Sequence, residues 1–236
     1  DVTGLGYPGE VTYPGATGAT APTDSGGSHV GMGGLYGASA KAPTYGSVER
    51  PREAGSGGWG GSVSPGGGTL RIEAGTVALG GATAKIVANG EGVHVRGGAG
   101  GSIWITVGSM TGDGLIEAAG GASYRRGGGG AVAIEYGVAT GTALTRVNAK
   151  GGSGGSAAEN GGAGTVVLKG SGATHGTLRV DNLGATGQQT VLPSLGSGTA
   201  QSGTASATLV TDRSATIPAY FAGHWVEITR GGSLLG

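Results

Sequence analysis

The residues with the most catalytic pattern in this chain are four carboxylates that recur at matching places in a repeated two-strand unit. Glu73 and Glu135 occupy matching places in the first strands of two units, and Glu117 and Asp181 occupy one position of two second strands. Glu73 and Glu135 lie two units apart, so stacking at about 4.8 Å per strand would separate them by about 10 Å. Glycosidases use two carboxyl groups about 5–10 Å apart. This pattern therefore suggests polysaccharide cleavage. The competing interpretation is that the same carboxylates form a solvated outer face.

Three aromatic residues could bind a sugar ring by stacking. Trp104, Tyr124 and Tyr136 lie in or beside the central repeat, and Glu135 adjoins the last of them. Together these four residues are the candidate ligand-binding set. The competing interpretation is that they are surface aromatics that shield glycine backbone from water.

Metal and thiol chemistry have little support. The chain has no cysteine, which excludes disulfides and thiol catalysis. The histidines are not spaced as metal ligands on one element, and they are His29, His94, His175 and His224. We expect His29 to form a hydrogen bond that fixes its glycine-rich loop. We expect no cofactor, with calcium bound through Asp113, Asp181 or loop carbonyls as the alternative.

The elements that must position these residues form a repeat. First-strand cores are expected at 70–72, 103–107, 132–136 and 166–168. Second strands are expected at 85–90, 115–120, 146–151 and 179–184, with spacings of 30, 31 and 33 residues. A fixed period of this size is typical of repeat architectures. Two short strands per unit bury too little surface alone, so the units are expected to stack.

An all-β parallel solenoid, a β-helix with long glycine-rich loops, satisfies this pattern best. The connections are longer than the two-residue turns of hairpins. We expect a right-handed coil, as is usual for parallel crossovers. An antiparallel β-sandwich is the alternative. The side chains expected to point inward are Ile72, Ile86, Ile103, Ile105, Leu115, Val132, Ile134, Val147, Val166, Leu168, Leu178 and Val180.

Glycine supplies 59 of 236 residues, so the apolar core per residue must be thin. No triplet period of the collagen type runs through the chain, and the Ile/Val strands argue against disorder. Backbone must therefore pack on backbone. We expect the glycine runs at 66–68 and 127–130 to form stretches of polyproline II type.

The chain is expected to divide into two parts. Residues 1–206 are assigned to the glycine-rich solenoid, with an irregular excursion at 1–68, repeats at 69–184 and a second excursion at 185–206. Residues 207–236 form a cap or the start of a following module. Within that part, 209–211 and 225–228 have strand patterning.

Charge and hydropathy limit the partners. Fourteen basic and fourteen acidic residues give no net charge, and Arg125–Arg126 is the densest basic pair in the repeats, so nucleic acid is not an expected partner. No apolar run approaches 18 residues, so no membrane span is expected. The chain opens with Asp1, and we interpret it as a processed part of a longer protein.

The chain resembles the glycine-rich modules of large bacterial cell-surface and secreted proteins, which also have look-alikes in plants. The motifs that carry the resemblance are GGSHVGMGG, YGSVERP, GGGTLRIEA, KIVANG, GGAGGSIWITVGSMTGDGLIEAAGG and GGGGAVAIEYG, and the resemblance covers most of the chain. It implies an extracellular, modular, adhesive or structural protein without assigned catalytic residues. One departure is Ala131-Val132, where such modules carry an arginine in a GGGRIAI-like run.

These observations favour a structural or adhesive module of an extracellular surface protein or fibre, without catalysis. Its expected partners are cell-surface glycans or neighbouring modules of the same assembly. One alternative is a β-helix that binds or cleaves polysaccharide, as a lyase or glycosidase. The other is a subunit of a self-assembling filament.

Overall fold

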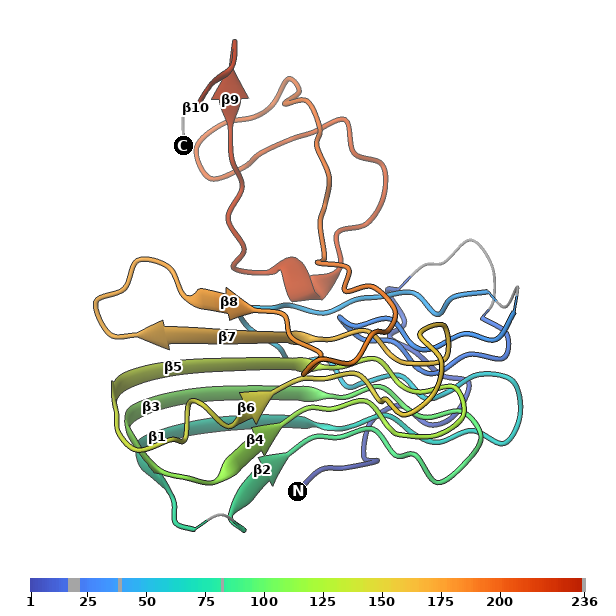
Figure 1. The fold of residues 1–236 in the computed structure, drawn as a ribbon. Coiled ribbons are helices and arrows are strands. Elements are labelled where there is room, and N and C mark those ends of the chain that lie inside the picture. The colour runs from blue at the N-terminus through green and yellow to red at the C-terminus, as the bar shows by residue number, and fades with distance from the viewer. Residues whose placement is uncertain (17–21, 38–39, 82, 235–236) are drawn as a thin grey trace. The chain divides into compact units, whose positions relative to one another are not determined.

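The computed structural model describes residues 1–16, 22–37, 40–81 and 83–234 (Figure 1). The chain forms two compact units, Asp1–Pro193 and Ser194–Gly236. The sequence placed this boundary later, after residue 206. The structure places it after Pro193 because residues 200 and 201 pair with residues 210 and 211. Ala200 bridges Thr211, and the Gln201 N–H donates to the Val210 carbonyl.

The first unit is a parallel β-solenoid of about three turns, as the repeat predicts. One sheet has the order β1-β3-β5-β7-β8 and the other has the order β2-β4-β6. The strands of the first sheet are β1 (Thr69–Leu79), β3 (Ser102–Gly112), β5 (Ala131–Ala139), β7 (Thr165–Gly170) and β8 (Thr177–Arg179). Those of the second sheet are β2 (Lys85–Val87), β4 (Leu115–Glu117) and β6 (Val147–Asn148).

The core lies between these two sheets and follows the period-2 alternation of the strands. On β3, Ile103 and Ile105 have no exposed surface, whereas Thr106 faces solvent. In-register stacking places Ile103 beside Val132 and Ile105 beside Ile134, so each rung buries the one below it. The predicted inward residues that are buried are Ile103, Ile105, Val132, Ile134, Val147 and Val166.

The fourth repeat does not continue the coil. Leu178 and Val180 were predicted to point inward, but they are 44% and 47% exposed. The reason is topological: β8 pairs antiparallel with β7, so it turns back instead of joining the second sheet. The antiparallel return ends the parallel stack at this side.

Opposite the strands, the glycine-rich segments pack as a bundle held by backbone hydrogen bonds. Along residues 97–101, backbone N–H groups three residues apart donate to carbonyls of the same neighbouring segment. Gly97 and Gly100 donate to Arg125 and Gly128 of one segment, and Gly98 and Gly101 donate to Glu91 and Ala88 of another. Ala99 donates to Ser56 of a third segment. A three-residue period without internal hydrogen bonds is that of the polyproline II helix. The stretch at 127–130 bonds outward in the same way, in agreement with the sequence expectation.

Glycine is required in this bundle because the backbones touch. Gly101, Gly130 and Gly164 each come directly before a strand, and each lies on the glycine of the preceding rung. A Cβ atom on Gly130 would lie 2.0 Å from the carbonyl oxygen of Gly101, and one on Gly164 would lie 1.8 Å from that of Gly130. These separations leave no space for any side chain, which explains the high glycine content physically.

The second unit contains little regular structure. A short 3₁₀ helix, η1 (Ala219–Phe221), precedes β9 (Thr229–Arg230) and β10 (Ser233–Leu234), which form an antiparallel pair. The strands predicted at 209–211 and 225–228 are not formed as such. Gly231 and Gly232 take positive φ angles and supply the turn between β9 and β10, which places the hairpin after the predicted strand.

Candidate functional site

The outer face of the five-stranded sheet carries a shallow groove beside Trp104. Trp104 on β3 is the register partner of Arg71 on β1, and the Arg71 guanidinium lies 4.4 Å from the centre of the indole ring. Arg52 approaches the same ring at 5.7 Å. The groove has a volume of about 180 Å³, and its walls are Pro51, Arg52, Thr69, Leu70, Arg71 and Trp104. Cations over an aromatic face are stabilised by its quadrupole, so the indole holds both guanidiniums in place.

A ligand in this groove would meet charged hydrogen-bond donors that lie on an apolar surface. Arg71 also pairs with Glu73, and both side chains are 60% exposed, so solvent screens that pair. A guanidinium binds carboxylate or sulfate through two parallel N–H bonds. The groove can therefore accept an acidic group better than a neutral sugar face, since Arg71 already covers the indole.

The carboxylate row predicted from the sequence exists. Register aligns Glu73 with Thr106, Thr106 with Glu135, and Glu135 with Lys169. Glu73 and Glu135 are thus separated by one full strand, and Lys169 lies next to Glu135. The row borders the groove on the outer face, where it forms a mixed charged strip.

The predicted aromatic residues do not share one face. Trp104 points to the outer face, whereas Tyr136 packs against the core from the inner face of β5. Tyr124 lies in the loop before the next glycine run and is 67% exposed. Of the four candidate residues, Trp104 and Glu135 share a face of the sheet, because Glu135 lies two residues from the register partner of Trp104.

The second carboxylate position is tied to its neighbours. Glu117 Oε1 accepts a hydrogen bond of 2.9 Å from Asn89 Nδ2, and Lys150 Nζ lies 3.8 Å from Glu117 Oε2. Asp181 Oδ1 accepts the N–H of Leu183 at 2.7 Å. These contacts hold both carboxylates in structural hydrogen bonds.

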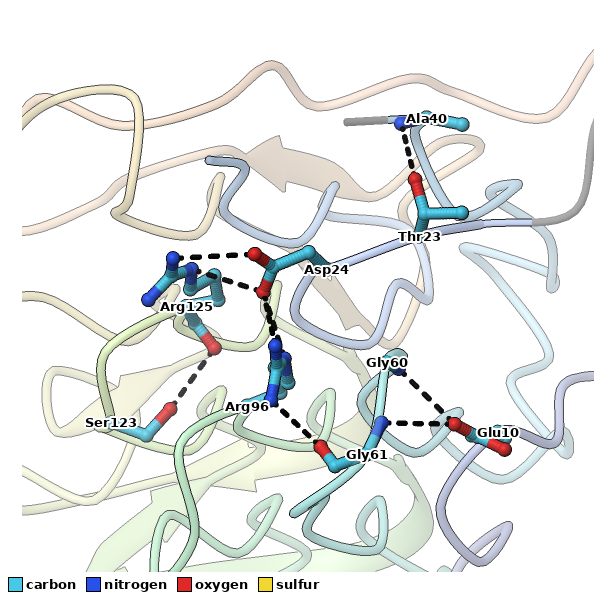
Figure 2. Close-up of polar contacts among 9 residues, drawn as sticks. All are labelled: Glu10, Thr23, Asp24, Ala40, Gly60, Gly61, Arg96, Ser123 and Arg125. Atoms are coloured by element: carbon cyan, nitrogen blue, oxygen red, sulfur yellow. Dashed lines mark hydrogen bonds and ion pairs between the residues drawn. The ribbon is translucent and has the colours of Figure 1, made fainter. Parts of the chain in front are cut away.

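A charged cluster at the loop end of the bundle was not anticipated (Figure 2). Asp24 Oδ1 accepts from Arg96 Nε at 2.8 Å and lies 2.7 Å from Arg96 Nη2, while Asp24 Oδ2 accepts from Arg125 Nη2 at 3.3 Å. One carboxylate therefore joins two successive rungs to the N-terminal excursion. A sequence signal existed, since Arg96 and Arg125 both come just before glycine runs at the same phase of the repeat.

Further contacts fix the same loops. The Arg96 guanidinium donates to the Gly61 carbonyl oxygen at 2.9 Å, and Glu10 Oε1 accepts the N–H groups of Gly60 and Gly61. Figure 2 shows how these bonds continue from the Asp24 cluster to the N-terminal segment. The cluster is a clamp between distant segments, with its arginines engaged by protein acceptors.

His29 lies inside the glycine bundle. Its Nδ1 donates to the Gly100 carbonyl oxygen at 3.0 Å, because a carbonyl can only accept. Its ring lies 5.0 Å from that of Tyr45, which in turn stacks on Tyr13 at 5.4 Å. Burial lowers the pKa of His29 to about 4. The predicted hydrogen bond at His29 is confirmed, and its acceptor belongs to a remote segment.

Among the residues that the structure describes, no three His, Asp or Glu side chains gather as a metal-holding group. The calcium alternative at Asp113 and Asp181 stays a prediction. Within the same described residues, no helix is long and apolar enough to cross a membrane.

Comparisons with protein-family models, with curated proteins and with solved structures returned no match to this chain.

Proposed function

We propose that the chain is a structural and adhesive module of an extracellular surface protein or fibre, and that it does not catalyse a reaction. Its partners are cell-surface glycans or neighbouring modules of the same assembly. The extracellular location is proposed from the resemblance to bacterial glycine-rich surface modules.

The observation that carries the proposal is the use of backbone as the packing material. The glycine columns and the crosswise hydrogen bonds of the bundle leave side chains such as Tyr124 and Val93 free on the outside, at 67% and 73% exposure. The charged clamp at Asp24 locks the loop end of successive rungs together. A scaffold of this kind would hold these exposed side chains in a fixed geometry.

A paired adhesion and turnover assay tests the proposal. The whole chain is applied to immobilised cell-surface glycans, and the same glycans are then assayed for new reducing ends and for the ultraviolet absorbance of unsaturated uronates. We expect retention without either product. Release of products in proportion to the amount of chain would overturn the non-catalytic assignment.

The groove beside Trp104 supports a second candidate, a polysaccharide-binding module. Two guanidiniums on one indole suit a chain that carries carboxylate or sulfate groups, as in acidic polysaccharides. Glu135 and Glu73 would be the residues of a cleaving variant of this alternative.

A further inference from the structure

The free edge of β1 is the feature of the solenoid that the proposed function does not use. In the part of the chain that the structure describes, β1 ends the order of the five-stranded sheet and pairs on one side only, with β3. It is 11 residues long and contains no proline, whereas β8 at the other end has three residues. A long unprotected edge is a template for another strand.

The apolar side chains of β1 are only partly covered, although Ile72 packs against the core. Leu70 and Ile72 are partly exposed, although their register partners Ile103 and Ile105 have no exposed surface. The difference arises because β3 has a strand on each side and β1 has one. A strand alongside β1 would bury these side chains and satisfy the backbone groups of the edge at once.

The backbone groups that face the open edge can be assigned from the hydrogen bonds. The N–H of Ser102 bonds to the carbonyl of Gly68, so Ser102 directs its backbone groups towards β1. Thr69 is the register partner of Ser102, and matching positions of parallel strands point the same way. Alternation then puts the free backbone groups on Thr69, Arg71, Glu73 and Gly75.

We propose that this edge binds a second copy of the chain, with the two β1 strands antiparallel across a twofold axis at Ile72. In this register Arg71 of each copy lies opposite Glu73 of the other, in a hydrogen-bonded pair. Ile72 faces Ile72 of the second copy in a non-hydrogen-bonded pair, where side chains are closest. Leu70 lies opposite Ala74 on the same inner face, so apolar residues meet apolar residues.

Charge selects this register over its neighbours. Moving the axis to residue 71 would place Arg71 opposite Arg71 of the second copy, and moving it to residue 73 would place Glu73 opposite Glu73. Like charges directly opposite each other in a sheet are unfavourable. An axis between two residues would match free backbone groups with groups already bonded to β3. The stretch TLRIEAG is thus complementary to its own reverse only about Ile72.

The pairing is short and closes on itself. The ladder between β1 and β3 is interrupted at Gly75, and β1, β3 and β5 curve towards the second sheet (Figure 1). Residues 76–79 therefore turn away from the twofold axis. Because the opposite end of the sheet is the short antiparallel β8, association through β1 gives a twofold dimer rather than a filament.

Charge exchange tests the proposal on the whole chain by sedimentation equilibrium. The wild type should reach twice its mass of 22.3 kDa. Glu73→Arg should weaken dimerisation at least tenfold, because like charges then face each other twice. The double variant Arg71→Glu with Glu73→Arg should restore the wild-type dissociation constant within about threefold. A wild type that stays monomeric at 200 µM, or a double variant no better than the single one, overturns the proposal.

A disulfide test is independent of charge. Because the chain has no cysteine of its own, an introduced cysteine can link only to the same residue of another copy. Ile72→Cys should form an intermolecular disulfide on mild oxidation, since Cα atoms of a non-hydrogen-bonded pair are about 4.5 Å apart. Thr76→Cys on the same strand is the matched control. Its two copies would be on the order of 25 Å apart at about 3.4 Å per residue, so it should not link. Equal linkage of both variants would contradict the twofold register.

Discussion

The Nδ1 atom of His29 lies 3.0 Å from the carbonyl oxygen of Gly100, although 71 residues separate them in the chain. The contact joins the N-terminal excursion to the glycine segment that leads into β3. Nδ1 must carry the proton for this bond. Burial lowers the pKa of His29 to about 4, so the folded imidazole is neutral near pH 7. Its burial beside Tyr45 makes a charged form costly there.

Acid should therefore destabilise the fold through His29. The unfolded chain protonates histidine near pH 6.5, whereas burial lowers the pKa of folded His29 to about 4. The unfolded state binds more protons between these values, so the free energy of unfolding falls as pH drops from 6.5 towards 4. The loss approaches about 3 kcal/mol, at about 1.4 kcal/mol per pH unit. Urea unfolding at several pH values measures it.

The control for this prediction must separate His29 from Glu53. Burial raises the pKa of Glu53, so its contribution has the opposite sign: it is present at low pH and is lost as pH rises through the folded value. His29→Gln should remove the histidine part of the pH dependence, while His175→Gln at an exposed site should leave it. An unchanged slope in His29→Gln would contradict the assignment.

Alanine at Gly130 should be among the most damaging small substitutions. Its Cβ atom would lie 2.0 Å from the carbonyl oxygen of Gly101, and backbone cannot yield there without shifting a whole rung. We expect a loss of about 4 kcal/mol or more, or failure to fold. Gly80→Ala is the matched control, because no heavy atom lies within 4 Å of its added Cβ, and it should change stability by about 0.5 kcal/mol or less. Thermal unfolding of both variants decides the comparison.

Asp24→Asn should loosen the loop end of the bundle. The substitution leaves two largely buried guanidiniums, those of Arg96 and Arg125, without their carboxylate. We expect a loss of about 2 kcal/mol, the size of a charge-assisted hydrogen bond in a partly exposed setting. Glu49→Gln removes an exposed carboxylate and should be nearly neutral. Equal unfolding midpoints for the two variants would contradict a stabilising role for the Asp24 clamp.

Trp104→Ala tests the groove. If an acidic polysaccharide binds there, loss of the indole frees Arg71 and Arg52 from their fixed positions, and affinity should fall at least tenfold by calorimetry. Tyr124→Ala on the remote loop should change affinity less than twofold. Glu135→Gln should keep binding and would abolish cleavage if the carboxylate row is catalytic. Binding unaffected by Trp104→Ala would exclude the groove.

The parts of the fold that local patterns encode could be predicted. Alternation at Ile103–Ile105 and its repeat at Val132–Ile134 set both the strands and their inward faces, because a strand has a period of two whatever it packs against. The recurrence of second strands predicted stacking, since one unit cannot bury its own apolar face. The glycine runs predicted backbone packing, because only a residue without Cβ permits that approach.

Contacts between distant segments could not be read in the same way. The return of β8 against β7 depends on where the stack ends, and it left Leu178 exposed against the prediction. The candidate aromatics divided between faces because Tyr136 falls on the inner register of β5. The Asp24 clamp spans 72 residues to Arg96 and 101 residues to Arg125.

The sequence by itself thus determined the repeat, the strand faces and the need for glycine, because each is set within a few residues. Tertiary structure alone decided which polar groups meet: His29 with Gly100, Asp24 with two arginines, and Trp104 with Arg52 of the N-terminal excursion. These contacts depend on the length and course of each irregular segment before the chain returns to the stacked strands, and no local sequence period encodes that course.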